Sequence, residues 1–272
     1  MRRWLTGVAL AALTLSGRVE AQGTPIDSAT IPDRQLFHRS DLYVAGAFVG
    51  ATIALLPADR HLTSVFRTGS LQDNATAKHL ASAGSFFGGP GPLIIGPAMY
   101  LVGRFGHVPR VAALAVHGTE AVLIGAGVAD VIKFVAGRAR PYATLDSNSH
   151  DFSLGRGFGK GQYQSFPSGH ATAAFSAAAA VVAETHEWAP QSTWYVAPIM
   201  FGGATMVGLS RIYNDQHWAS DVMMGAAIGT FAGLKTVRFN HTHAGNQVDR
   251  ILLGARLVPT ANGTALAFSS TF

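Results

Sequence analysis

The sequence contains no cysteine and few charged residues. The absence of cysteine excludes disulfide frameworks, thiolate nucleophiles and cysteine-ligated zinc, and it leaves the redox compartment open. Charged residues make up 13% of the 272 positions, about half of the usual quarter, whereas the apolar share of 48% is ordinary. No run of five or six like charges accompanies the net charge of +5, so we expect no nucleic-acid partner.

The N-terminus has the pattern of an export signal. Arg2 and Arg3 precede an apolar run from Leu5 to Leu15, which is too short to span a membrane, and Val19 and Ala21 are small residues placed before a cut ahead of Gln22. The pattern predicts a signal peptide over residues 1–21 and an exported protein of the periplasm or cell envelope. An uncleaved amphipathic anchor is the alternative. A polar, irregular lead-in is expected over residues 22–41.

Six apolar stretches of helix-compatible length follow, rich in Ala, Leu, Val and Gly and poor in β-branched alternation. They predict an all-α bundle with a core of six helices over residues 42–240. Glycine and proline from Gly88 to Pro92 predict a break or kink in the second stretch. The stretches are Tyr43–Leu56, Ala81–Val102, Arg110–Val131, Ala171–Ala183, Trp194–Leu209 and Ala219–Leu234.

The length of these stretches bears on membrane insertion. A span needs about 20 apolar residues, whereas several stretches are shorter or contain polar groups such as His117, Thr119 and Glu120. Their length favours buried helices of a soluble protein over spans. If all six stretches crossed the membrane, three of them would precede Lys133, and the loops after Lys133 would lie on the cytoplasmic side of an exported chain. This argues against six spans, but membrane association stays open.

The C-terminal residues 241–272 differ from the rest. Residues 250–258 and 264–272 flank Asn262-Gly263, the strongest short hairpin signal, so a linker and a C-terminal β-hairpin are expected, with a frayed tail as the alternative. His241 and His243 form an H-x-H pattern that suits a metal, although a polar linker is the favoured interpretation there.

The first polar cluster contains Lys133 and Arg140, which stand seven residues apart before Pro141. If the helix continues to Arg140, the two cations lie on one face at its end. Taken alone, such a pair also fits a basic helix C-terminus that complements the helix dipole.

The second cluster, Pro167-Ser168-Gly169-His170, leads directly into an Ala-rich helix. Ser168 is a natural N-cap, and Gly169 has no Cβ to keep an anion from the backbone N–H groups of the first turn. The pattern predicts a phosphate site, or else a capped helix with His170 on the surface.

The third cluster runs from Ser210 and Arg211 to His217 and Asp221. In a helix, His217 and Asp221 are i and i+4 neighbours, so the carboxylate is expected to accept from one ring nitrogen and leave the other free to attack. A His–Asp pair that only stabilises a helix start is the alternative.

Together the clusters supply three cations, a helix N-terminus, a nucleophile with an orienting acid, and a second histidine that can protonate a leaving oxygen. Their order and spacing, K-x6-R-P, P-S-G-H and S-R-x5-H-x3-D, resemble the type 2 phosphatidic acid phosphatase and vanadium haloperoxidase superfamily. The resemblance covers Lys133 to Asp221 without a departure at any defined position.

The resemblance implies a helical fold of this type and a role for each matched residue. Lys133, Arg140 and Arg211 would hold the phosphate oxygens together with Ser168 and Gly169. His217 would be the nucleophile that forms a phosphohistidine, Asp221 its orienter and His170 the general acid. No metal would be needed, and vanadate or phosphate would fit the site.

Three functions are consistent with the motifs. The favoured one is a phosphomonoesterase acting on a lipid, polyprenyl or soluble phosphate ester, and the alternatives are a vanadate-dependent haloperoxidase and a non-catalytic envelope scaffold. The long segment from Tyr142 to Phe166 is predicted to be a mobile lid whose Arg156 and Lys160 meet anionic substrates, or a plain flexible connection. Neither the substrate nor the oligomeric state follows from the sequence.

Overall fold

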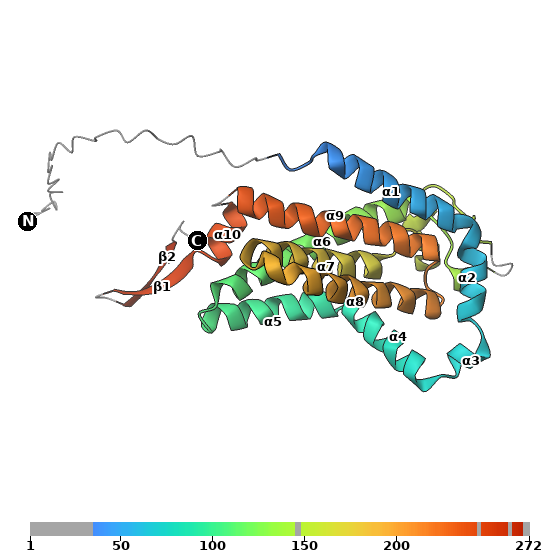
Figure 1. The fold of residues 1–272 in the computed structure, drawn as a ribbon, viewed down its shortest axis with the longest axis horizontal. Coiled ribbons are helices and arrows are strands. Elements are labelled where there is room, and N and C mark those ends of the chain that lie inside the picture. Colours follow the sequence, from blue (N-terminus) through green and yellow to red (C-terminus); the bar gives the residue numbers. More distant parts are fainter. Residues whose placement is uncertain (1–34, 145–147, 244–245, 261–262, 269–272) are drawn as a thin grey trace, which may run out of the picture. The chain divides into compact units, whose positions relative to one another are not determined.

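The computed structural model describes residues 35–144, 148–243, 246–260 and 263–268, and side chains up to Gly254. The predicted signal peptide and most of the predicted lead-in fall outside these residues, and both stay predictions. The described part is built almost entirely of helices, as the all-α prediction requires (Figure 1). The helices are α1 (Arg39–Leu55), α2 (Asp59–Phe66), α3 (Gly69–Gln72), α4 (Ala75–Gly88), α5 (Gly91–Phe105), α6 (Pro109–Ala136), α7 (Gly169–Trp188), α8 (Thr193–Tyr213), α9 (Ala219–Thr242) and α10 (Gln247–Leu252).

Every predicted apolar stretch lies in a helix, and the second is divided where glycine and proline predict it. Helix α4 ends at Gly88 and α5 starts at Gly91, and the two are bent by 61°. The sequence did not indicate α2, α3 or α10, which are short and polar. Helix α10 lies in the segment expected to be a linker and also takes in residues 250–252, where the first strand of the hairpin was expected to begin. Helix α9 runs two residues past the predicted domain end at residue 240.

Helix α7 is central and packs against α6, α8 and α9 (Figure 1). Its contact with α9 depends on glycines spaced four residues apart on α9. A Cβ at Gly225 would lie 2.5 Å from the carbonyl oxygen of Ser168, and one at Gly229 would lie 2.3 Å from that of Thr172. Because these positions lack a Cβ, the start of α7 lies directly against the start of α9. This contact brings two of the three polar clusters together.

The helices are longer than the apolar stretches suggested. Helix α6 has 28 residues and continues through the polar positions because its polar side chains have partners: the partly buried Glu120 carboxylate accepts from Asn240 Nδ2 at 2.7 Å. Two helical segments, Arg39–Phe66 and Pro109–Ala143, are long and apolar enough to cross a membrane, and the bent pair α4–α5 would be a third if it forms one span.

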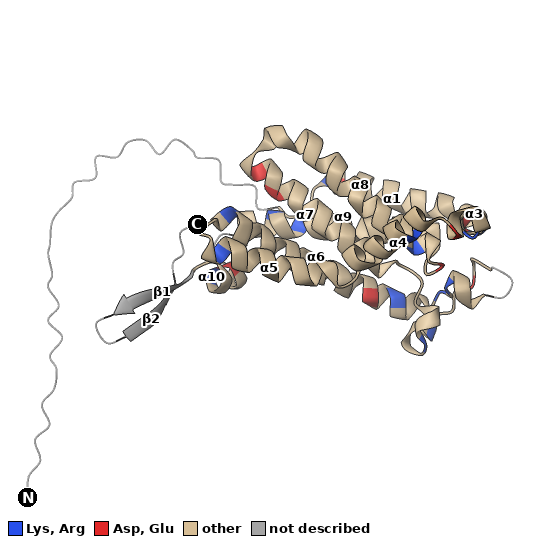
Figure 2. Ribbon diagram, turned by 90° about the horizontal axis from the view of Figure 1, so that it is seen from below, with Lys and Arg blue, Asp and Glu red and all other residues tan. Residues whose placement is uncertain are grey.

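Large apolar side chains are exposed on several helices. Tyr43 on α1, Phe105 on α5 and Trp194 on α8 are 80%, 76% and 78% exposed. Charged residues gather toward the ends of the helices and leave long uncharged stretches between them (Figure 2). Soluble monomers rarely expose so many large apolar side chains, and two helical segments are long and apolar enough to span a bilayer, so the protein is membrane-associated. The expectation of buried helices in a soluble protein is therefore wrong, because it was based on helix lengths that were too short.

Two strands follow α10, β1 (Ala255–Thr260) and β2 (Gly263–Phe268), which pair antiparallel with Leu257 opposite Leu266. The predicted hairpin falls on these strands. Residues 261–262 lie outside the described residues, so the turn itself stays a prediction.

Candidate active site

The end of α6 separates the two cations of the first cluster. Gly137, with φ +56°, caps the helix in the left-handed region, where a Cβ would also lie 2.1 Å from the carbonyl oxygen of Ser153. Lys133 thus stands in the last turn of α6, whereas Arg140 follows in extended backbone with φ −75° and ψ 155°. The prediction that both cations share one helix face is wrong, because the chain leaves the helix at Gly137.

The second cluster forms the predicted helix start. Ser168 is the N-cap of α7, and its hydroxyl accepts from Ala171 N–H. The lack of a Cβ at Gly169 leaves room for Lys133, because a Cβ at this position would lie 3.2 Å from Lys133 Nζ. The lysine therefore reaches the N-terminus of α7 although it belongs to α6. Its ammonium also donates to Asp130 at 2.7 Å, a partner with a half-exposed side chain.

Arg211, which is buried, and Arg140, which is partly buried, each have a buried donor without a partner among the described residues. Arg140 donates to Gln216 Oε1 at 2.5 Å and Arg211 donates to Ser85 Oγ at 2.7 Å, yet the Nε of each arginine has no hydrogen-bond partner among the described residues. Neither arginine forms an ion pair with a carboxylate in this part of the chain. Buried cations without counter-charges are costly to retain, so the arrangement favours an anion.

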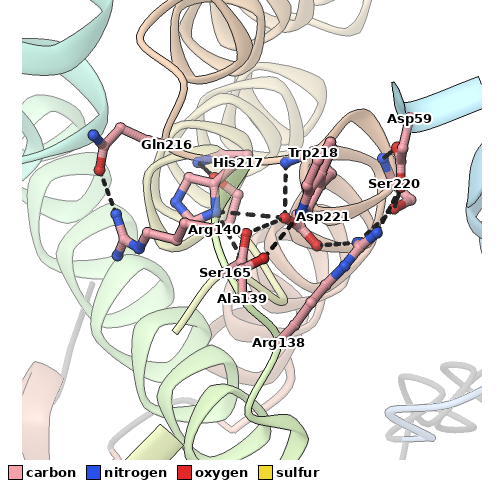
Figure 3. Close-up of polar contacts among 12 residues, drawn as sticks. Asp59, Arg138, Ala139, Arg140, Ser165, Gln216, His217, Trp218, Ser220 and Asp221 are labelled. Carbon is pink, nitrogen blue, oxygen red and sulfur yellow. Dashed lines mark hydrogen bonds and ion pairs between the residues drawn. The ribbon is translucent and has the colours of Figure 1, made fainter. Parts of the chain in front are cut away.

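His217 precedes α9 and presents a defined tautomer (Figure 3). Its Nδ1 lies 2.7 Å from the carbonyl oxygen of Ser165. A carbonyl only accepts, so Nδ1 carries the proton and Nε2 holds the free lone pair. Nε2 forms no hydrogen bond within the described residues, which leaves it available to attack.

Asp221 does not bond to His217 directly. Its Oδ2 lies 3.8 Å from His217 Nδ1, too far for a hydrogen bond, and accepts instead from Ser165 Oγ at 2.5 Å and from Trp218 N–H at 2.8 Å (Figure 3). The predicted i,i+4 pair fails because α9 begins only at Ala219, so His217 lies before the helix. Asp221 positions the histidine through Ser165, which contacts both residues.

Arg138 is the main residue that the sequence did not single out. It is fully buried and donates to Asp221 Oδ1 at 2.5 Å and to Asp59 Oδ2 at 2.7 Å, and Asp59 in turn accepts from the Ser220 hydroxyl (Figure 3). Arg138 and Arg140 are two residues apart in one basic segment, and no sequence signal tells which of them is paired. Asp59 and Ser85 precede the motifs by more than 45 residues.

The electrostatics of the pocket follow from its excess of positive charge. Burial, followed by the charges of Arg211, His217, Arg140 and Lys133, lowers the pKa of His170 to about 3. That all four act on this imidazole shows that the three clusters converge. Burial also lowers the pKa of His217, with Arg140 and Arg211 acting in the same direction against Asp221. Both imidazoles are therefore neutral near pH 7 when no anion is bound.

The segment between Tyr142 and Phe166 is anchored over its described part. Arg156 donates to the carbonyl oxygen of Gly137 from Nε at 3.1 Å and to Asp151 Oδ1 from its Nη2 at 2.8 Å, and its guanidinium lies 4.0 Å from the centre of the Tyr163 ring. These contacts hold the Arg156 side chain against the end of α6 and Asp151 instead of leaving it free for a substrate, whereas the predicted mobility of the segment stays a prediction. Lys160 is exposed.

An apolar pocket of about 440 Å³ is lined by residues of α5, α6, α7 and α8 together with the end of α4. Ala174, one turn after His170 on α7, and Val207 on α8 line it. A Cβ at Gly88 would lie 2.5 Å from Val207 Cγ1 and 2.8 Å from His170 Cβ. Gly88 thus lies close both to Val207, which lines the cavity, and to the Cβ of His170.

Comparisons with known proteins agree with the geometry. Residues 115–244 match the PAP2 superfamily. A segment of 107 residues is 34% identical to the lipid A 1-phosphatase of Porphyromonas gingivalis and covers 39% of this chain and 19% of that protein. A segment of 114 residues is 32% identical to the lipid A 1-phosphatase of Rhizobium johnstonii and covers 40% of this chain and 41% of that protein. The chain thus spans less than half the length of either relative.

A solved structure is also similar. The crystal structure of a transmembrane PAP2-type phosphatidylglycerolphosphate phosphatase from Bacillus subtilis has 22% sequence identity, covers 74% of this chain and 94% of that chain, and has a TM-score of 0.44. All three motifs, from Lys133 to Asp221, fall inside residues 115–244, which match the PAP2 superfamily, so the resemblance inferred from them is confirmed.

Proposed function

We propose that the protein is a metal-independent phosphatase that hydrolyses the phosphate monoester of a lipid at the membrane. The observation that carries the proposal is the pair of arginines, Arg140 and Arg211, whose buried Nε donors have no partner among the described residues beside two neutral imidazoles. A phosphate group would supply the missing acceptors and the missing negative charge.

The residues support a two-step transfer. Nε2 of His217 attacks phosphorus, the bond to the alcohol oxygen breaks, and a phosphohistidine forms while His170 gives its proton to the leaving oxygen. In the second step His170 takes a proton from water, the water oxygen attacks phosphorus, and the P–N bond breaks to release inorganic phosphate. Arg140, Arg211 and Lys133 would hold the charged phosphoryl oxygens in both steps, with the N-terminus of α7.

Binding of the substrate phosphate would also explain how His170 gains the proton that it later donates. In the empty pocket burial, together with the neighbouring cations, keeps this imidazole neutral, with its pKa lowered to about 3. A bound phosphate adds negative charge next to the same imidazole and so favours its protonated form. The general acid would thus be charged only when substrate is present.

A lipid substrate is favoured by the apolar cavity beside His170 and by the exposed apolar helices. The cavity would take part of the apolar portion of the substrate while the phosphate lies among the arginines. The two relatives are named for a phosphatase of lipid A, so lipid A phosphates are the first substrates to test.

The proposal is tested with the full-length protein in detergent micelles, by phosphate release from lipid A, from phosphatidic acid and from p-nitrophenyl phosphate. We expect turnover of a lipid phosphate, and we expect His217→Ala to lower it by at least about 10³-fold, because the variant lacks the nucleophile. His243→Ala is the control, since this ring stacks on Phe239 near the end of α9, far along the helix from the pocket.

A short incubation with radiolabelled substrate and an alkaline quench tests the intermediate, because phosphohistidine survives alkali. Label should remain on the wild-type protein and be absent from His217→Ala. Full turnover by His217→Ala would contradict the proposal. Halide oxidation that requires added vanadate, without any phosphatase activity, would favour the haloperoxidase alternative.

A further inference from the structure

A second polar cluster lies at the opposite end of α6, α7 and α9 from the phosphate pocket. It contains His117 on the first half of α6, Glu184 near the end of α7 and His241 near the end of α9. Glu184 contacts His117 Nδ1 through Oε1 and lies 3.0 Å from His241 Nε2 through Oε2. The proposed phosphatase reaction uses none of these residues.

The charge of Glu184 is balanced only by imidazoles. Its carboxylate is fully buried, and among the described residues its side-chain partners are the two histidines, with no lysine or arginine. A buried carboxylate between two imidazoles requires positive charge in the form of either protons or a metal ion.

A fourth residue fixes which nitrogen of His117 faces Glu184. Asp249 on α10 lies 3.2 Å from His117 Nε2 through Oδ1, and Asn246 donates to the other carboxylate oxygen at 2.8 Å. If Nε2 donates to Asp249 and the proton on Nδ1 is released, Nδ1 can direct its lone pair at the centre of the cluster. A carboxylate that orients the far nitrogen of a histidine is the usual support of a metal-bound imidazole.

We propose that this cluster is a structural site for a divalent transition metal of the zinc type, bound by His117 Nδ1, the Glu184 carboxylate and His241 Nε2. One ligand atom from each residue lies within 4.8 Å of the others, and ligands of one tetrahedral zinc ion stand about 3.3 Å apart, so small side-chain movements suffice. The His241 side chain is 35% exposed, which leaves a path for the ion and room for a water as fourth ligand.

The proposed ion would join three helices of the bundle and, through Asp249, also α10. Binding would release the protons that the imidazoles otherwise hold. Because the cluster lies at the other end of the helices, the ion would stabilise the fold without taking part in phosphoryl transfer.

The test uses the full-length protein in detergent, stripped with EDTA and dialysed against Zn²⁺, with metal content measured by mass spectrometry. We expect one equivalent of zinc per chain and an unfolding temperature that rises with zinc and falls again with EDTA. His241→Ala and His117→Gln should bind less than a tenth of the wild-type zinc. Because His241 lies partly at the surface, His241→Ala should stay folded.

Two matched variants complete the test. His243→Ala, two residues farther along the chain, should bind zinc like the wild type, which excludes non-specific capture by the H-x-H pattern. His217→Ala should also keep its zinc, which separates this site from the phosphatase site. Folded wild-type protein without stoichiometric zinc, or equal losses in His241→Ala and His243→Ala, would overturn the proposal and leave a cluster that holds protons only.

Discussion

Two neighbouring groups of arginines lie at the end of the bundle that holds the candidate active site, and they differ in whether carboxylates pair with them. In the paired group, Arg138 is fully buried and both of its terminal nitrogens reach carboxylates, Asp59 and Asp221. In the open group, Arg211 is buried and Arg140 is partly buried, both donate to neutral oxygens, and each keeps an Nε without a partner among the described residues.

This difference distinguishes an arginine that stabilises the fold from arginines that are suited to bind an anion. A buried arginine with a carboxylate at each terminal nitrogen needs no further anion, and its bonds hold α2, the end of α6 and α9 together. Arginines without carboxylates repel each other: burial together with the charge of Arg140 lowers the pKa of Arg211 to about 10. Such an arrangement is completed only by an anion, and the following predictions test this distinction.

The largest predicted effect is a loss of stability on substitution of the arginine in the paired group. Arg138→Met removes the partner of two buried carboxylates, and we expect a loss of about 3–5 kcal/mol in the free energy of unfolding. A much lower unfolding temperature in detergent would show it. Arg211→Met is the control and should unfold close to the wild-type temperature. A stable, well-folded Arg138→Met would contradict the comparison.

A substitution in the open group should lower the activity and leave the stability unchanged. Arg211→Lys keeps the charge but loses the planar set of donors, so kcat/KM should fall by about 10²–10³-fold, while the unfolding temperature stays unchanged. The measurement is phosphate release from a lipid phosphate, with circular dichroism to check the fold. Equal activity of lysine and arginine at this position would mean that Arg211 does not contact the phosphate.

The pH profile depends on the same excess of positive charge. The lowered pKa of His217 keeps this nucleophile neutral in mild acid, below the ordinary histidine value of about 6.5. The proton for the leaving group, carried by His170 or by the phosphate, is lost as pH rises above about 6, the second pKa of a phosphate ester. We therefore expect kcat/KM to be highest below pH 6.5 and to fall about tenfold per unit on the alkaline side.

p-Nitrophenyl phosphate provides the control for this profile. Its leaving group needs no proton, so the alkaline fall should be weaker with this substrate than with a lipid phosphate. An optimum above pH 8 for both substrates would contradict the assigned protonation states.

The smallest effect should come from the apolar cavity. A Cβ at Gly118 on α6 would meet nothing within 4 Å, and this glycine lines the cavity, so Gly118→Leu should fill part of it. We expect kcat/KM for a long-chain lipid phosphate to fall about tenfold, with p-nitrophenyl phosphate unaffected. Gly127→Leu, an equally open site on α6 that does not line the cavity, is the control. Equal losses on both substrates would show that the cavity does not bind the lipid.

The sequence was informative about local chemistry. Ser168 is the predicted N-cap of α7, and the break predicted between Gly88 and Pro92 separates α4 from α5. Both features depend on a few adjacent residues, and their physical causes are local. The extent of α6 could not be predicted in this way, because its polar positions are tolerated through partners on α7 and α9.

By itself, the sequence determined the helical class of the chain and the set of residue types that suits a phosphate, since periodicity, capping and motif spacing depend only on residues that are close in sequence. Only the tertiary structure decided which arginine is paired, because Arg138 and Arg140 differ in partners that come from distant helices. It also decided that His217 bonds to Ser165 instead of Asp221, since the orientation of a ring before a helix start depends on the neighbouring chain segment. The cluster of His117, Glu184 and His241 likewise arises only when three helices pack together.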